Sequence, residues 1–527
     1  MKALVARYGY LTWIALVVAF ALLHGLHLTA DFPAHSPWPD WARFTDEGWY
    51  ANAAIRAHLT TPSGAHWHHP GGFNPSVAVP LWPALVWLLF SVTGVSLVAV
   101  RALAVALFCA NLILAERLLR SHLPRWANLL ALTLLATSPF LYAFSRLALL
   151  EPLLLTLTLL ALTVALRLSI ARRFTAAAAL LGLLVAVMIL AKTTAVFLLP
   201  ALLWAAAWPL RTEPRRLLRA LAIAALTAAA ILACWATAIL RLHLLGDLTY
   251  FFFLNHYPDP RSASGWLASL WWSLHGALWI DPILLPVLGL LLLAAFVCFR
   301  QPWAAALLRD PLFVASLLAV VGFLAFMAAQ DHTQPRYYTI VAVFAFLALA
   351  QLLAALLGQP GALRIVGALA LLLVVGVTAR NAAQTLDYAL HPQYTWITAA
   401  RSLTAYVDAQ PGNRRLLLAT SGDQITLMTG LPAANDDLGS DLPERRIRRD
   451  DPGWFAAWND LDPAILAAIH RSYALRQVAV YPVMDDPERN RLVLFRLVPC
   501  MPAPGAARTV AALGQILPED RIAIPVE

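Results

Sequence analysis

Long apolar stretches separated by short polar turns fill most of the first 380 residues. Each stretch has about 20 residues, which is enough for a helix to cross the hydrocarbon layer of a bilayer. We expect about eleven such spans, at 8–29, 98–118, 125–145, 150–168, 174–190, 193–209, 217–240, 282–299, 311–329, 337–357 and 361–379. The pattern therefore predicts a polytopic α-helical membrane protein.

The apolar stretch at 76–94 is an exception, because Pro75, Pro80, Pro83 and Gly94 make it a poor straight span. Arginines cluster in the turns between the other stretches, at Arg117/Arg120/Arg125, Arg167/Arg172/Arg173, Arg211/Arg215/Arg216/Arg219, Arg300/Arg309 and Arg364. Short cytoplasmic loops retain arginine, so all these turns should lie inside. All these turns lie inside only if the stretch 76–94 lies in the outer interface or re-enters the membrane. The N-terminus is then inside and the C-terminal part outside.

The composition changes to that of a soluble domain after Arg380. Strand patterns occur at 415–420, 478–483 and 491–498, and a helical pattern occurs at about 462–475. We therefore expect two domains: a membrane domain at 1–380 with outer loops 30–97 and 242–281, and a small outward-facing α/β cap at 381–527. The arginine-rich stretch 444–449 is either a solvated loop or a contact with lipid phosphates.

Composition restricts the class of protein. With 61% hydrophobic and 13% charged residues, the chain differs from soluble domains, which are about a quarter charged. The net charge of +9 comes from arginines in the turns between spans, which argues against a nucleic-acid partner. Two lysines beside thirty-six arginines, and the absence of an unblocked Asn-x-Ser/Thr acceptor, favour a bacterial inner-membrane protein.

The first outer loop contains two adjacent carboxylates, Asp46 and Glu47. Charges beside hydrocarbon are costly, so the pair is a candidate functional site. One carboxylate can act as a general base that removes a proton from an acceptor hydroxyl or amine, and the pair can also contact a metal or substrate. The alternative is a capping role at a helix N-terminus, because a helical stretch from Trp49 to Leu59 follows.

Other charged residues fall at expected outer turns. Glu151, followed by Pro152, suits either a helix N-terminus or a second site carboxylate oriented by Arg146. Three cations, Arg101, Lys192 and Arg336, also lie at outer helix ends. They would serve a phosphate group at the membrane surface, or act as anchors at the interface.

Two further groups of residues carry weaker signals. His66, His68 and His69 in a Gly/Pro loop are a poor metal-ligand pattern, so we expect no certain metal site and leave a divalent cation open. The aromatic residues of loop 242–281 indicate an interfacial belt, or the lining of an acceptor or sugar groove.

The order of these motifs along the chain resembles that of a known superfamily. The order is Asp46-Glu47-Gly48-Trp49-Tyr50, His69-Pro70, Gly94-Val95-Ser96 with Arg101, Ser145-Arg146 with an acid five residues on, Ala191-Lys192, and Pro335-Arg336-Tyr337. Over residues 8–380 the chain resembles the GT-C polyprenyl-phosphate-sugar-dependent glycosyltransferases, near the protein mannosyltransferases and the aminoarabinose–lipid A transferases. It departs from their pattern at Glu151, which is usually Asp, and at His69-Pro70-Gly71-Gly72, which is usually a basic residue and two prolines.

The resemblance implies an activity. Asp46 would be the catalytic base, with Glu47 and Glu151 as further acids, and substrate contacts would come from Arg101, Arg146, Lys192, Arg336, Tyr50, His69 and Tyr337. The donor would be a polyprenyl-phosphate sugar and the acceptor a lipid, glycan or protein. Transfer would proceed with inversion at the outer face of the membrane, among its lipids. There are two alternative functions without catalysis of transfer: a lipid-linked glycan flippase, and a non-catalytic scaffold.

A reporter fusion tests the topology. A reporter attached after Gly94 is expected to read as exterior, because the stretch 76–94 then stays on the outer side. A fusion after Arg120 is the matched control and should read as cytoplasmic. A cytoplasmic reading after Gly94 would overturn the topology.

Overall fold

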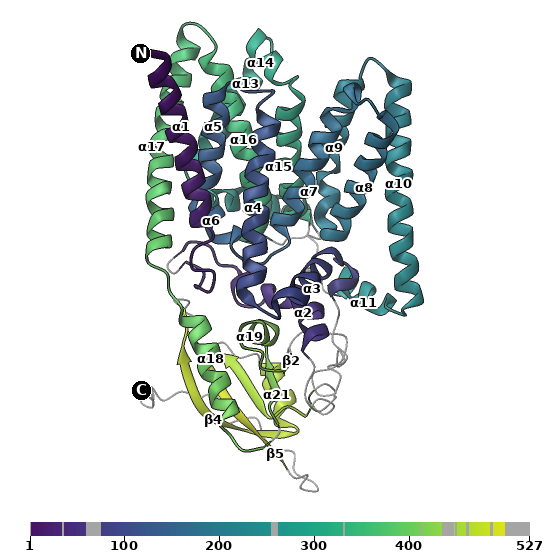
Figure 1. Ribbon diagram of the computed structural model, residues 1–527, viewed down its shortest axis with the longest axis vertical. Helices are drawn as coiled ribbons and strands as arrows, with labels where there is room; N and C mark the ends of the chain where they lie inside the picture. Colours follow the sequence, from purple (N-terminus) through teal and green to yellow (C-terminus); the bar gives the residue numbers. More distant parts are fainter. Residues whose placement is uncertain are drawn as a thin grey trace.

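The computed structural model describes residues 2–33, 36–59, 75–254, 262–329, 333–412, 414–434, 447, 451–459, 463–484 and 489–500. A bundle of long helices makes up most of the molecule, and a small α/β domain lies against one end of it (Figure 1). That end is termed the cap end below. The predicted fold class, a helical membrane protein with a small C-terminal α/β domain, is confirmed.

Each of the eleven stretches expected to span is largely helical. The bundle helices are α1 (Lys2–Leu23), α4 (Leu97–Leu119), α5 (Arg125–Thr137), α7 (Glu151–Leu166), α8 (Phe174–Ala191), α9 (Leu199–Ala207), α10 (Pro214–Arg241), α13 (Leu284–Val297), α15 (Pro311–Ala329), α16 (Tyr338–Leu357) and α17 (Ala362–Leu390). In the described part of the chain, seven helices are long and apolar enough to cross a membrane, or up to nine if each of two bent pairs is one span. The number eleven stays a prediction.

The arginine-rich turns lie at the end of the bundle away from the cap. The N-terminus and α14 (Pro302–Leu307), which follows Arg300, are both at that far end (Figure 1). The short turns there include η3 (Leu168–Ile170) and η5 (Trp208–Leu210). The arrangement matches the alternation predicted from the arginines, and which end faces the cytoplasm stays a prediction.

Shorter elements cover the cap end. They are η1 (Trp41–Arg43), α2 (Asp46–His58), η2 (Pro75–Val77), α3 (Leu81–Thr93), α6 (Pro139–Ser145), η4 (Thr193–Leu198), α11 (Leu245–Thr249), η6 (Tyr250–Leu254), α12 (Ala263–Gly276), η7 (Ala277–Trp279) and η8 (Pro335–Tyr337). The helix α3 lies across this end instead of running along the bundle (Figure 1). Its 13 residues, with exposed Trp87, Leu88 and Val92, suit the interfacial position expected for 76–94.

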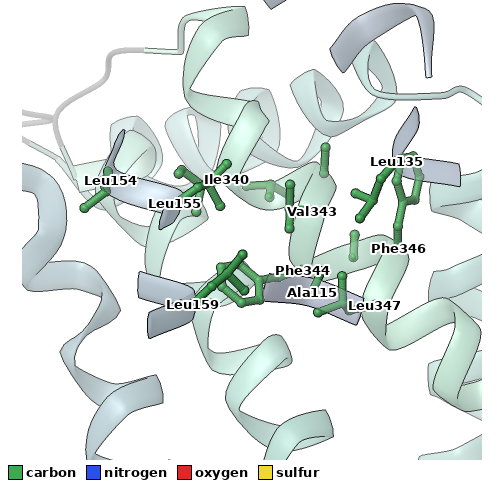
Figure 2. Close-up of a cluster of buried hydrophobic side chains, with 14 of the residues drawn as sticks. Ala115, Leu135, Leu154, Leu155, Leu159, Ile340, Val343, Phe344, Phe346 and Leu347 are labelled. Carbon is green, nitrogen blue, oxygen red and sulfur yellow. The ribbon is translucent and has the colours of Figure 1, made fainter. Parts of the chain in front are cut away.

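The bundle core centres on α16, whose side chains are buried along almost the whole helix. Figure 2 shows Phe344 and Leu347 of α16 near Leu159 of α7 and Ala115 of α4. A helix that is apolar all round is surrounded either by other helices or by lipid, and α16 is surrounded by other helices. The core therefore fixes the cap-end termini of α7 and α16, where Glu151 and Arg336 lie.

Two glycines allow helices to approach closely. A Cβ on Gly182 of α8 would lie 2.2 Å from the carbonyl oxygen of Ala224 in α10, and one on Gly322 of α15 would lie 2.0 Å from that of Phe197. Small residues at such crossings are how membrane helices bring their backbones together.

In its described residues, the cap is a five-stranded mixed sheet of order β2-β1-β3-β5-β4 with the helices α18, α19 and α21. Its elements are α18 (Thr395–Asp408), β1 (Leu417–Ala419), α19 (Gly422–Thr429), β2 (Ala433–Ala434), β3 (Trp454–Trp458), α21 (Pro463–His470), β4 (Tyr473–Pro482) and β5 (Arg491–Pro499). β1 is parallel to β2 and β3, and β5 is antiparallel to β3 and β4. The three predicted strands and the predicted helix correspond to β1, β4, β5 and α21. The arginines of 444–449 lie outside the described residues.

The chain passes from the bundle toward the cap within one continuous helix, and the division into domains at 380/381 stays a prediction. The helix α17 continues through residue 381 to Leu390, and the globular cap begins with α18 at Thr395. The composition changes at Arg380 because the helix leaves its apolar surroundings there, while its backbone hydrogen bonds continue. Arg380 itself pairs with Asp281.

The loop before α2 is bound to the cap at two places. The Asp31 carboxylate accepts hydrogen bonds from the backbone N–H of Thr395, at 2.7 Å, and of Trp396, and so caps α18. Phe44 is fully buried in the cap core, where its ring packs against Trp458. The loop and the cap therefore share one hydrophobic core.

The close approach at Gly182 generates a test. Replacing Gly182 by Ala should destabilise the bundle by about 1–3 kcal/mol, because the new methyl group meets a backbone oxygen that cannot yield. Thermal unfolding in detergent measures the effect. Gly289→Ala in α13 is the control, since its Cβ would meet nothing within 4 Å. Equal unfolding midpoints for the two variants would contradict the close packing of α8 on α10.

Candidate active site

The acidic pair forms the first turn of α2 at the cap end. Successive residues of a helix point about 100° apart, so the two carboxylates face different partners. Thr45 stands at the N-cap position, yet its side chain makes no capping hydrogen bond and instead donates to Asp46 Oδ1 at 2.9 Å. Both carboxylates lie in the first turn of the helix, where negative charge is favoured, so the capping and the catalytic interpretations both stay predictions. The predicted helix after the pair is confirmed.

Glu47 is fully buried and joins four separate parts of the chain. Its carboxylate accepts two hydrogen bonds from Arg101 of α4, Nε at 2.7 Å and Nη2 at 2.6 Å. It also accepts from the backbone N–H of Ala148, at 2.9 Å, and from the side-chain amide of Gln424 in the cap, at 3.1 Å. A carboxylate with this many donors is held in one orientation.

Arg101 is occupied by these contacts. Besides its two bonds to Glu47, Nη1 donates to the carbonyl oxygens of Leu28, at 2.9 Å, and Ala30, at 2.7 Å. These bonds use four of the five N–H groups of a guanidinium. Arg101 therefore fastens the start of the first loop to α4.

Asp46 faces a different arginine, Arg336 of η8. Arg336 Nη2 lies 3.2 Å from Asp46 Oδ2, and Nη1 donates to Asp40 Oδ1 at 2.6 Å. Asp40 also accepts from the backbone N–H of Arg336, at 2.9 Å. One guanidinium thus lies between two carboxylates. The sequence analysis did not identify Asp40, and its only signal there was a carboxylate six residues before Asp46 in the same outer loop.

The surroundings of Asp46 favour a proton acceptor. Burial raises the pKa of Asp46 above its ordinary value near 4, the charge of Arg336 lowers it, and the charges of Asp40 and Glu151 raise it. Burial also raises the pKa of Tyr50, on the same helix, so its hydroxyl stays neutral. A buried carboxylate with a raised pKa is a candidate general base.

A second buried ion pair lies close by. Lys192, at the turn between α8 and η4, pairs with Oε1 of Glu151 at the start of α7. The Lys192 ammonium lies 4.5 Å from the ring centroid of Tyr337, and the Arg336 guanidinium lies 5.0 Å from the same ring. Tyr337 therefore stands between two of the three cations that the sequence analysis assigned to a phosphate.

Two polar atoms of this cluster are buried and unsatisfied within the described ranges. They are Oε2 of Glu151 and Nε of Arg336. Buried polar atoms are normally hydrogen-bonded, and those without a partner point to a ligand or an ordered water.

Arg146 differs from its expected role of orienting Glu151. Its guanidinium donates to Tyr142 and to the carbonyl oxygens of Leu26 and His27, both at 2.6 Å. Lys192 holds Glu151 instead, because the turn after α6 directs Arg146 toward the first loop. Arg146 thus supports that loop from a second side.

The histidines and any metal have no described site. His69, with His66 and His68, lies outside the described residues. Among the residues that the structure does describe, no group of three or more His, Cys, Asp and Glu side chains could hold a metal ion. In the long outer loop, Trp266, Trp271 and Trp272 are exposed, as in an aromatic belt at a membrane interface.

Comparison with known proteins identifies relatives of this architecture. A family model described as dolichyl-phosphate-mannose-protein mannosyltransferase matches residues 68–240. A search of curated proteins finds no significant match. The crystal structure of ArnT from Cupriavidus metallidurans bound to undecaprenyl phosphate has a TM-score of 0.56 and 14% identity, over 92% of this chain and 98% of that one.

An archaeal structure extends the comparison. The oligosaccharyltransferase AglB from Archaeoglobus fulgidus, in complex with an inhibitory peptide and a dolichol-phosphate, has a TM-score of 0.51 and 12% identity, over 93% of this chain and 74% of that one. At such low identities the likeness establishes a shared fold. Together with the family match, it confirms the resemblance predicted from the motifs.

The buried pair of Glu47 and Arg101 generates a stability prediction. Arg101→Met should destabilise the protein by about 3–5 kcal/mol, because it leaves the Glu47 carboxylate buried without a cation. Thermal unfolding in detergent and the yield of monodisperse protein measure this. Arg120→Met is the control, since Arg120 pairs with Glu116 at an exposed position and should have almost no effect. A stable Arg101→Met variant would show that the pair does not hold the loop.

Proposed function

This chain is related to the GT-C superfamily of glycosyltransferases, and from that premise we propose that it moves a sugar from a polyprenyl phosphate to an acceptor at the outer face of a bacterial inner membrane. The observation that carries the proposal is the buried cluster at the cap end. There Asp46 faces Arg336, and Glu151 faces Lys192, around the ring of Tyr337.

Asp46 is the acceptor-activating base in this proposal. Its pKa is raised by burial, which makes the carboxylate a better proton acceptor than an exposed aspartate. Arg336 keeps it ionised, and the Thr45 hydroxyl orients it. Tyr50 and Tyr337 line the same space, and the neutral Tyr50 hydroxyl can bind the sugar.

Lys192 and Arg336 hold the phosphate end of the donor. The unsatisfied Arg336 Nε and the Lys192 ammonium supply donors to phosphate oxygens, which favour such charge-assisted bonds. Glu151 neutralises Lys192 until the donor arrives and then gives up its place to the phosphate. These cations stabilise the negative charge that develops on the leaving phosphate.

Glu47, Arg101 and Arg146 support the site without touching substrate. Glu47 and Arg101 satisfy each other, and Arg146 is bound to carbonyl oxygens of the first loop. These contacts limit the roles that the sequence analysis gave to the three residues. Glu47 becomes a positioning acid, and Arg101 and Arg146 become anchors of the loop.

The reaction is a single displacement. The acceptor oxygen or nitrogen attacks the anomeric carbon and loses its proton to Asp46. The bond from that carbon to the phosphate oxygen breaks, and polyprenyl phosphate leaves with the electron pair. Attack opposite the leaving group inverts the configuration. The acceptor is a lipid, a glycan or a protein, and the reaction requires no nucleic acid.

Replacing Asp46 by Asn tests the assignment. The variant should fold and insert normally but lose about 100-fold or more of the transfer rate, because the amide cannot accept the proton. The assay uses purified protein in proteoliposomes with radiolabelled undecaprenyl-phosphate mannose as the probe donor and lipid, glycan and protein fractions of the host membrane as acceptors. Asp387→Asn, at an exposed position of α17, is the matched control.

The pH profile adds a second measurement. The base must be ionised, so wild-type transfer should fall as pH drops through the Asp46 pKa, and the midpoint should lie above the ordinary aspartate value near 4. Near-normal transfer by Asp46→Asn would remove Asp46 from the mechanism. Donor crossing the membrane without transfer would favour a flippase.

A further inference from the structure

The helix that carries the acidic pair has no cap from its own segment of chain. The first N–H groups of a helix lack partners within it, and the Thr45 side chain supplies none. The N–H of Gly48, the third residue of α2, donates instead to Oε1 of Gln424, at 2.7 Å. Gln424 lies in α19 of the cap, 376 residues later in the chain. The cap domain therefore caps α2.

The same amide also holds Glu47. Nε2 of Gln424 donates to Glu47 Oε2 at 3.1 Å. The two contacts define the orientation of the amide, because an N–H group cannot accept and a carboxylate cannot donate. Gln424 is fully buried, so water does not compete for either bond.

Three further features hold α19 against α2. A Cβ on Gly48 would lie 2.3 Å from the backbone of Asp423 and Gln424, so only glycine allows this approach. At the other end of α2, Arg56 Nη2 lies 3.6 Å from Asp423 Oδ1. The helix α19 is itself anchored, since Ile425 is buried in the cap core and Leu427 in the bundle core.

We infer that Gln424 is a positioning residue for sugar transfer, supplied by the cap: it holds the first turn of α2 so that Asp46 meets Arg336. The inference rests on the proposed function. Asp46 precedes Glu47 and Gly48 in that turn, so fraying or rotation of the turn moves its carboxylate away from Arg336, 3.2 Å distant. Misplacement by about 1 Å is enough to cost about 100-fold in rate.

Hydrogen–deuterium exchange tests the positioning without any substrate. Gln424→Met keeps the volume of the side chain but removes both hydrogen bonds. Peptides covering 44–58 should exchange at least about fivefold faster in this variant of the full chain, as expected for loss of a helix cap. Gln477→Met, on the exposed face of β4, is the matched control and should leave α2 unchanged. Unchanged exchange in Gln424→Met would overturn the inference.

Transfer kinetics test the link to chemistry. With undecaprenyl-phosphate mannose as donor, Gln424→Met should lower kcat about tenfold to 100-fold while KM for the donor stays within about twofold, since Lys192 is untouched. The acidic limb of the pH profile should move to higher pH, because Asp46 loses the charge that keeps it ionised. The charged and titratable groups that face Asp46 are Arg336 of η8, Asp40 before η1, Glu151 of α7, Lys192, Tyr50 and Tyr337.

A second variant covers the case in which Gln424→Met fails to fold. Gln424→Asn keeps a polar amide but is one methylene shorter, so the amide no longer reaches both the Gly48 N–H and Glu47, and the same changes in exchange and kcat are expected. Faster exchange with an unchanged kcat and pH profile would overturn the role in transfer. Failure of the proposed function is recognised separately, by normal transfer in Asp46→Asn.

Discussion

The arrangement of the cap end depends on the buried ion pair between Glu47 and Arg101. Burying a carboxylate is costly, and this one is stabilised by donors from α4, from the turn before α7 and from the cap. Four segments distant in sequence are thereby fixed to one group. Asp46 is the next residue in the chain, so the geometry at Arg336 follows from the geometry at Glu47. Glu47, which supports the fold, therefore fixes the position of Asp46, the proposed base.

Much of this architecture follows from local sequence. The lengths of the apolar stretches predict the bundle helices, and the prolines around 76–94 distinguish the short helix α3 from them. Strand patterns predict β4 and β5, and β5 is buried at four successive residues, Leu492 to Phe495. The cations Lys192 and Arg336 were identifiable because a charge at the end of an apolar helix is rare and costly.

The pairings within the site were not accessible from sequence. Sequence alone offered no way to distinguish the three cations Arg101, Lys192 and Arg336. The structure does so, because Arg101 is bound by Glu47 and two carbonyl oxygens, whereas the other two lie in the candidate site. Asp40 and Gln424 carry no motif, because their partners lie 296 and 376 residues away. The change of composition near residue 381 did not mark the end of a helix, because α17 continues through it to Leu390.

The cap is held to the first loop at three separate places: Asp31 on α18, Phe44 within the cap core, and α2 against Gln424. Contacts at three places restrict the movement of the cap more than a single hinge would. We therefore expect the cap to act as a fixed wall of the site. In the proposed reaction, donor and acceptor then reach the cluster from the side, between the helices that border the membrane, and the bilayer sets the route of entry.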